Sequence, residues 1–253
     1  MEIAGIQKLT LVDFPGHVAA TVFTRGCNFR CGFCHNPELV LPDHYNPLLS
    51  EKQIVDFLIS RFGKLNGICI TGGEPTLQKD CDKFISHMRA LGYDVKLDTN
   101  GSNPKMLKKI IEDGDVNYIA MDIKGTLEKY PLTTNCQLPI ANKRIDNLKI
   151  EKLNENWKLK NDNLLSNIQE SIKLIMNSGI DYEFRTTVCH PLHEVKDFKE
   201  IGEMIRGAKR YFIQNFQQSK HINEHEKYSP FSDEEIMEAE KIMGEYIKES
   251  RLR

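Results

Sequence analysis

The feature that most constrains this chain is an alternation between short apolar runs and stretches with helical periodicity. Repeated strand–helix units predict an α/β fold with a parallel sheet. Six runs have strand length, at residues 17–24, 67–71, 94–98, 117–122, 182–188 and 210–215. Two of the intervening stretches show a clear apolar helical face, formed by Cys81, Phe84, Ile85 and Met88 and by Leu164, Ile168, Ile172 and Ile175.

Six consecutive units predict an open, partial (β/α)6 barrel of the TIM type more readily than a doubly wound sheet, although periodicity leaves the strand order open. In both architectures the site lies at the carboxyl ends of the strands. A length of 253 residues predicts a single domain, 1–253, that ends in a loop and helix over 217–253. Capping-box spacings predict a first helix after Ser50 and a last one after Ser232.

Residues 133–162 interrupt this rhythm after the fourth predicted strand. They are rich in Asn, Lys and Asp and make a far longer connection than α/β units usually have. A lid, a partner-binding insertion and a solvated disordered loop all fit this composition.

Composition and charge give no reason to expect a nucleic-acid or membrane partner. The net charge is -2 and the isoelectric point is about 6.5, and no apolar run reaches the roughly 18 residues of a membrane span. The amino-terminal residues lack the layout of a signal peptide, so we expect a cytoplasmic protein. Seven cysteines, three of them within eight positions, indicate metal ligation in a reducing compartment.

Cys27, Cys31 and Cys34 form the strongest local motif, directly after the first predicted strand. Thiolates are soft ligands that suit an iron–sulfur cluster or zinc. A structural zinc site needs four protein ligands, and His35 is a nearby candidate for the fourth. The motif alone therefore permits a cluster or a closed, noncatalytic zinc site.

The Cys-x3-Cys-x2-Cys spacing resembles the signature of the radical S-adenosylmethionine (SAM) superfamily. This resemblance implies a 4Fe-4S cluster held by the three cysteines, whose fourth iron binds the methionine part of SAM. In that family an electron from the cluster cleaves SAM into methionine and a 5'-deoxyadenosyl species that abstracts a hydrogen atom. It also implies that Phe33, Cys34 and His35 lie next to SAM.

Three further motifs follow predicted strands. Gly72-Gly73-Glu74 resembles the superfamily's GGE motif, whose backbone meets the SAM amino group. Asp98-Thr99-Asn100-Gly101 and Asp122-Ile123-Lys124 resemble the DTNG and DxK motifs of glycyl-radical enzyme activating proteins. The resemblance implies that Asp98 and Asp122 lie near SAM or a monovalent cation, and that Ile123 and Lys124 contact SAM. From the residues alone, Asn100-Gly101 could equally be a tight turn, and Asp122 and Lys124 a surface ion pair.

The fifth predicted strand places Arg185 and Thr187 on one face and Phe184 on the other. An inward-facing arginine needs an anionic or hydroxyl partner, and our hypothesis is the SAM carboxylate or ribose. His190 and Asn215, at the ends of the fifth and sixth strands, are weaker candidates for SAM neighbours. Among the other cysteines, Cys69 and Cys81 are expected to pack in the core, and Cys136 has no visible partner.

The segment Gly26 to Pro37, which reads GCNFRCGFCHNP, resembles activating enzymes of glycyl-radical enzymes. With Leu11–Gly16, Leu97–Pro104 and Tyr182–Val188 it is most similar to activating proteins of anaerobic ribonucleoside-triphosphate reductase. The resemblance implies that the chain forms a glycyl radical on that partner, releasing 5'-deoxyadenosine and methionine, with reduced flavodoxin or ferredoxin as electron donor. The rival interpretation with the same chemistry is a small-molecule radical SAM enzyme of the deazapurine-synthase type.

Overall fold

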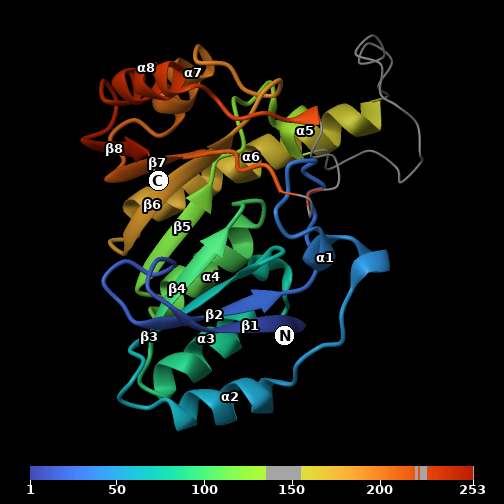
Figure 1. Ribbon diagram of the computed structural model, residues 1–253, viewed down its shortest axis with the longest axis vertical. Helices are drawn as coiled ribbons and strands as arrows, with labels where there is room; N and C mark the ends of the chain where they lie inside the picture. The colour runs from blue at the N-terminus through green and yellow to red at the C-terminus, as the bar shows by residue number, and fades with distance from the viewer. Residues whose placement is uncertain (135–154, 220–221, 223–226, 253) are drawn as a thin grey trace.

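The computed structural model describes residues 1–134, 155–219, 222 and 227–252. At its centre is one eight-stranded sheet in which the strands follow one another in chain order (Figure 1). The strands are β1 (Ile3–Thr10), β2 (Ala19–Thr24), β3 (Gly67–Gly72), β4 (Asp94–Thr99), β5 (Tyr118–Asp122), β6 (Asp181–Val188), β7 (Arg210–Asn215) and β8 (Glu249–Leu252).

Strands β2 to β8 run parallel to one another, whereas β1 runs antiparallel to β2. The order begins at β1 and ends at β8, so within the described residues the barrel does not close. The six expected strands are confirmed as β2 to β7. The chain therefore forms the predicted partial (β/α)6 barrel, with one additional strand at each edge.

Strands β4 and β6 separate an apolar outer face from a polar inner one, as period-two alternation requires. On β4, Val95 and Leu97 belong to the apolar core, while Lys96 and Asp98 pair with each other. On β6, Phe184 packs in the core and Arg185 pairs with Asp98. The inside of the barrel is therefore charged, and the main apolar core lies between the sheet and the helices.

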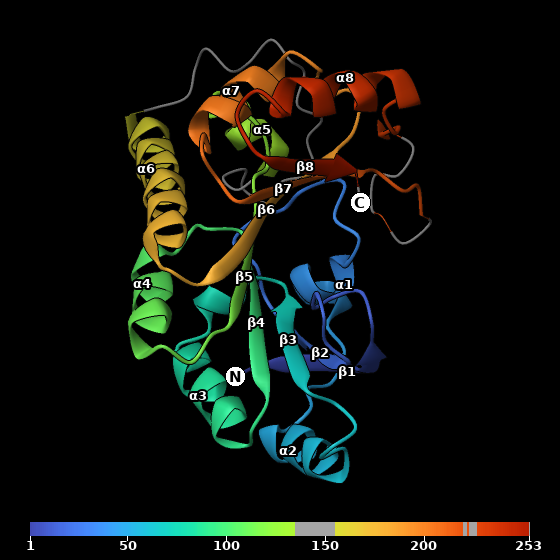
Figure 2. The ribbon, with the colours of Figure 1, turned by 90° about the vertical axis from the view of Figure 1, so that its left-hand side faces the viewer.

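The helices cover the outer face of the curved sheet, as Figure 2 shows for α3, α4 and α6. Every residue of the two predicted apolar helical faces is buried, which confirms both faces. The helices are α1 (Pro37–Val40), α2 (Glu51–Ser60), α3 (Cys81–Ala90), α4 (Pro104–Asp113), α5 (Tyr130–Thr134), α6 (Glu155–Asn177), α7 (Asp197–Met204) and α8 (Asp233–Met243), with 3-10 turns η1 (Pro42–His44) and η2 (Pro75–Leu77).

Both predicted capping boxes are present. The Ser50 hydroxyl accepts a hydrogen bond from the Gln53 amide at 3.3 Å, and the Ser50 amide donates to Gln53 Oε1 at 2.8 Å. Ser232 and Glu235 make the same reciprocal pair at the start of α8. The helix after Ser50 is not the first, because α1 precedes it as a single turn that begins at Pro37.

Most of the predicted insertion, residues 135–154, lies outside the described residues together with Cys136. Its two ends belong to α5 and α6, so helix occupies part of the range 133–162. No helix in the described part of the chain is both long and apolar enough to cross a membrane.

The packing of α6 makes a direct prediction for stability. Ile168 is fully buried in the main core, so Ile168→Ala is expected to lower the free energy of unfolding by about 2–5 kcal/mol through lost burial and a residual cavity. Met237→Ala, on an exposed position of α8, serves as the control and should stay within about 0.5 kcal/mol. Urea unfolding followed by circular dichroism measures the unfolding free energy of both variants. Equal losses in the two variants would contradict the placement of α6 in the core.

Candidate cluster and cofactor site

The cysteine loop begins just beyond the carboxyl end of β2 and folds back on itself. The Gly26 amide donates to the Leu39 carbonyl at 2.7 Å, and the Cys34 amide donates to the Cys31 carbonyl at 3.1 Å. The Arg30 guanidinium donates to the Phe29 carbonyl at 2.8 Å inside the loop. These contacts hold the cysteine loop in a folded conformation beyond the carboxyl end of β2.

The thiols lie in an environment that disfavours free thiolates. Burial raises the pKa of Cys27 to about 12, and the nearby carboxylate of Glu74 adds to the shift. Burial likewise raises the pKa of Cys31 to about 12, although the Lys124 ammonium opposes it. The charge of a Cys27 thiolate would also raise the pKa of Cys31, and that of a Cys34 thiolate would raise the pKa of both Cys27 and Cys31. Positive metal would therefore have to replace the protons before three thiolates could coexist here.

The donor set of the loop is three soft thiols, which suit an iron–sulfur cluster. Within residues 1–134, 155–219, 222 and 227–252, no three His, Cys, Asp or Glu side chains converge on a point where a single metal could be held. The thiolates of a cubane bind different irons and need no common centre.

The double glycine after β3 brings this strand against the cysteine loop. A Cβ on Gly72 would lie 2.4 Å from the Thr24 nitrogen, and one on Gly73 would lie 2.0 Å from the Gly26 oxygen. Gly72 also has a φ of 114°, which side chains disfavour. The two glycines thus lie against the end of β2 and the start of the cysteine loop, and their expected contact with SAM stays a prediction.

The Glu74 side chain is buried and serves as an anchor. It accepts hydrogen bonds from the Thr76 hydroxyl at 2.5 Å, the Thr99 hydroxyl at 2.7 Å and the Asn100 amide at 2.6 Å. Burial raises the pKa of Glu74, while the same hydrogen bonds oppose that shift. The carboxylate therefore fixes the loop that follows β4 relative to the loop that follows β3.

The charged residues at the strand ends form a continuous series of ion pairs, which we call the charge chain. Its members are Lys96, Asp98, Arg185, Asp122 and Lys124. Lys124 Nζ lies 2.9 Å from Asp122 Oδ2, and Arg185 pairs with Asp122 on one side and with Asp98 at 2.9 Å on the other. Asp98 in turn pairs with Lys96. Arg185 thus has the anionic partners that its inward position requires, and they come from the protein itself.

These pairs set the protonation of the carboxylates. Burial alone would raise the pKa of Asp98, but Arg185 and Lys96 hold it below its usual value. Arg185 and Lys124 do the same for the pKa of Asp122. Asp98 and Asp122 are shared among Lys96, Lys124 and Arg185, and the buried Glu183 carboxylate, 3.8 Å from Arg185, balances the third positive charge. The monovalent cation expected near Asp98 and Asp122 stays a prediction.

The remaining predicted residues divide into two groups. Phe33 is buried in a small cluster with Cys189 and Phe216, and Ile123 is buried behind the charge chain. His35 lies near the Phe216 ring, with a centroid distance of 5.8 Å. Burial lowers its pKa.

His190 and Asn215 face the carboxy-terminal segment. His190 stacks on Phe231 and pairs with Glu235, while the Asn215 side chain exchanges two hydrogen bonds with the Phe231 backbone. These contacts anchor the start of α8, and a role of either residue next to SAM stays a prediction.

Sequence reasoning missed two polar residues of the site. Lys96 is buried and completes the charge chain, and its position two residues before Asp98 on the same strand was the available signal. His193 is also buried: its Nδ1 accepts from the Cys189 amide at 3.2 Å, so its Nε2 is the nitrogen that donates to the Lys124 carbonyl at 3.1 Å. No sequence pattern pointed to His193.

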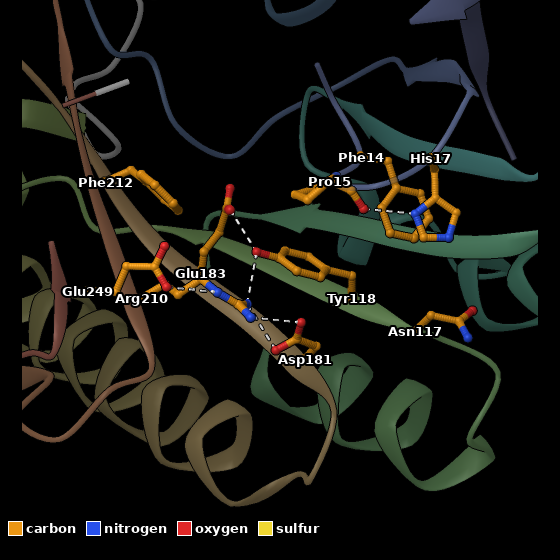
Figure 3. Close-up of a pocket in the computed structure, with 10 residues that line it drawn as sticks. All are labelled: Phe14, Pro15, His17, Asn117, Tyr118, Asp181, Glu183, Arg210, Phe212 and Glu249. Atoms are coloured by element: carbon orange, nitrogen blue, oxygen red, sulfur yellow. Dashed lines mark hydrogen bonds and ion pairs between the residues drawn. The ribbon is translucent and has the colours of Figure 1, made fainter. Parts of the chain in front are cut away.

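A cavity of about 380 Å³ lies at the opposite, amino-terminal end of the strands. Figure 3 shows its charged walls, where Arg210 pairs with Asp181 and the Tyr118 hydroxyl meets Glu183. Glu183 also lies 3.8 Å from Arg185. Polar side chains therefore connect this cavity to the charge chain through the inside of the barrel.

Comparison with known proteins identifies the family. The model of the radical SAM superfamily matches residues 21–208. The chain belongs to the radical SAM superfamily. Members of this superfamily use a 4Fe-4S cluster bound by three cysteines together with SAM, and the three cysteines of the loop supply that number of thiols. The expected cofactors are thereby confirmed.

Individual relatives include activating enzymes. A protein of Methanocaldococcus jannaschii named as a glycyl-radical enzyme activating enzyme is 29% identical over 249 residues, 97% of this chain and 92% of the relative. The pyruvate formate-lyase-activating enzyme of Listeria monocytogenes is 30% identical over 155 residues, 54% of this chain and 60% of that enzyme. The predicted resemblance to activating enzymes is confirmed.

Other relatives act on different substrates or share the fold alone. The GTP 3',8-cyclase of Helicobacter pylori is 29% identical over 194 residues, 76% of this chain and 51% of the cyclase. The structure of Streptococcus suis SuiB bound to its precursor peptide SuiA matches with a TM-score of 0.61 at 15% identity, covering 94% of this chain and 49% of SuiB. The latter supports the radical SAM fold.

The charge chain makes a prediction about pH. In Arg185→Met, the half-buried carboxylates of Asp98 and Asp122 lose a shared partner, which should lower the unfolding free energy at neutral pH by about 3 kcal/mol. Arg185 lowers the pKa values of Asp98 and Asp122 in the folded protein. Its full stabilising effect is therefore present above the pKa values that the two carboxyls have in the unfolded chain. The difference in unfolding free energy between Arg185→Met and the wild type should therefore become smaller as the pH falls below about 4.

Unfolding titrations from neutral to acidic pH measure this difference. Arg206→Met removes an exposed arginine paired with Glu203 and is the matched control, expected to follow the wild type at every pH. If the unfolding free energy of Arg185→Met differed from that of the wild type by the same amount at every pH, the proposed dependence of stability on the ionisation of Asp98 and Asp122 would be contradicted.

Proposed function

We propose that this chain is an activating enzyme that forms a glycyl radical on a partner enzyme. The observation that carries the proposal is the segment GCNFRCGFCHNP at the open edge of the barrel, combined with similarity to a named activating enzyme along 97% of the chain. The listerial relative that activates pyruvate formate-lyase supports the same class.

In this proposal Cys27, Cys31 and Cys34 hold the cluster. When bound, the cluster and SAM supply the one-electron chemistry that removes a hydrogen atom from a C–H bond. The loop contributes three soft donors in one turn, and the Lys124 ammonium lies close enough to lower the pKa of Cys31 and Cys34. A positive charge beside the thiolates offsets part of their mutual repulsion.

The residues around the thiols suit the groups of SAM. The Lys124 ammonium or the Arg185 guanidinium would bind the SAM carboxylate. The backbone of Gly72, Gly73 and Glu74 would receive the amino group. Phe33, His35, Asp98, Asp122 and Ile123 complete the proposed SAM site, with His190 and Asn215 as peripheral candidates.

The proposed partner is anaerobic ribonucleoside-triphosphate reductase, with reduced flavodoxin or ferredoxin as electron donor, in the cytoplasm. This rests on the resemblance carried by Leu11–Gly16, Leu97–Pro104 and Tyr182–Val188. Glycine is the residue whose α-carbon no side chain shields, so a glycine loop of the partner is a sterically suitable substrate.

A second candidate is a small-molecule radical SAM enzyme. The similarity to GTP 3',8-cyclase over 76% of the chain favours it, although the chain spans about half of that enzyme's length. In that case SAM cleavage would proceed with a small substrate and without a partner protein.

Electron paramagnetic resonance separates the two candidates. We expect an anaerobic mixture of reconstituted protein, SAM, reductant and the reductase to give a doublet centred on glycine. Replacing the target glycine of the reductase with alanine is the control and should abolish the doublet. Release of 5'-deoxyadenosine without any glycine signal would favour the small-molecule enzyme.

The ligand assignment has its own test. Cys31→Ala should fold, lose the full cluster and fail to cleave SAM, because two thiolates leave a second iron without its protein ligand. Cys81→Ala removes a buried core thiol at the start of α3 and is the matched control, which should retain iron, sulfide and cleavage. Iron and sulfide assays with 5'-deoxyadenosine analysis measure both. Normal cleavage by Cys31→Ala would contradict the assignment.

A further inference from the structure

The loop after β4 presents an amide directly to one of the three thiols. Nδ2 of Asn100 lies 3.8 Å from Sγ of Cys27, within the range of a hydrogen bond to sulfur. The backbone amide of Phe29 donates to the same sulfur at 3.4 Å. Cys27 thus receives two donors, one from its own loop and one from a different strand end.

The orientation of the Asn100 amide is fixed by its other contacts. Its Oδ1 accepts from the Ser102 amide at 2.9 Å, and its Nδ2 also donates to Asn28 Oδ1 at 3.0 Å. Asn28 in turn donates to the Ser102 hydroxyl at 2.9 Å. A flipped amide would place an oxygen against Asn28 Oδ1 and a nitrogen against the Ser102 amide, so only one orientation satisfies the network.

The backbone of Asn100 is held just as firmly. Its amide donates to the buried carboxylate of Glu74 at 2.6 Å, and Thr99 donates to the same carboxylate. Asn100 is itself buried. A donor fixed in this way does not need to reorganise when charge on the neighbouring sulfur changes.

From this geometry we propose that Asn100 is a positioning residue that donates a hydrogen bond to the Cys27 thiolate and raises the reduction potential of the cluster. The inference rests on the proposed role of Cys27 as a cluster ligand. Reduction adds negative charge that spreads onto the ligand sulfurs, and a hydrogen bond to sulfur stabilises the reduced form more than the oxidised form. Glu74 acts through Asn100 by holding its backbone.

The test is an anaerobic redox titration of the reconstituted protein, followed by the paramagnetic signal of the reduced cluster. Asn100→Ala removes the donor and should move the midpoint to a more negative potential. Asn100→Asp has nearly the same size but places a carboxylate near Cys27, so it should move the midpoint further in the same direction. Ser102→Ala is the matched control: it removes the hydroxyl that Asn28 contacts but keeps the backbone amide that orients Asn100, and should leave the midpoint unchanged.

Unchanged midpoints in both Asn100 variants, with normal iron content, would overturn the inference and leave the ligand assignment intact. A shift in Ser102→Ala as large as in Asn100→Ala would also overturn it, because the cause would then be a general disturbance of the loop. Failure of the wild type to assemble a cluster would instead refute the proposed function.

One measurement needs no variant. In reduced wild-type protein whose asparagine side chains carry ¹⁵N, the bond predicts a hyperfine coupling between a side-chain nitrogen and the cluster. Absence of any such coupling would overturn the inference.

Discussion

The site depends first on the parallel register of the sheet. Thr24 pairs with Gly72 between β2 and β3, and Asp122 pairs with Arg185 between β5 and β6. Because neighbouring parallel strands end at the same edge, the loops that follow them become neighbours although they are far apart in sequence. The double glycine reduces the separation further, since Gly73 has no side chain to keep its backbone from Gly26. A barrel with the same strands in another register would scatter these groups.

The charged interior is the second constraint. A buried carboxylate or ammonium is costly unless it is paired, and the chain from Lys96 through Arg185 to Lys124 pairs every member with a neighbour of opposite sign. These ion pairs restrict where each strand end can lie, because displacing one residue leaves its partner with an unpaired charge. The charge chain also places the Lys124 ammonium near the thiols, where its charge lowers the pKa of Cys31 and Cys34.

Much of this arrangement could be predicted from sequence. Strong alternation made β2 to β7 recognisable, and spacing singled out the cysteines, the double glycine and the carboxylates at the strand ends. The edge strands were missed for physical reasons: β1 carries two register irregularities and mostly partly exposed residues, and β8 is only four residues, none of them buried. Their structure depends on pairing with a neighbouring strand rather than on their own pattern.

Roles within the site were harder to predict than positions. Glu74 belongs to a recognisable motif, yet its side chain binds the loop after β4, a contact between residues 26 positions apart that no local pattern encodes. Asn100 fits a tight turn equally well from sequence, and its approach to Cys27 depends on tertiary structure. Residues that act through long-range hydrogen bonds, such as His193, leave no periodic signal.

The central claim is that three thiolates of one loop hold a cluster with an iron left open to SAM. The most direct test is the paramagnetic spectrum of the reduced, reconstituted protein before and after addition of SAM. Direct coordination predicts a clear change in the spectrum on binding, saturating at one SAM per cluster. A spectrum that is identical with and without saturating SAM would contradict the account.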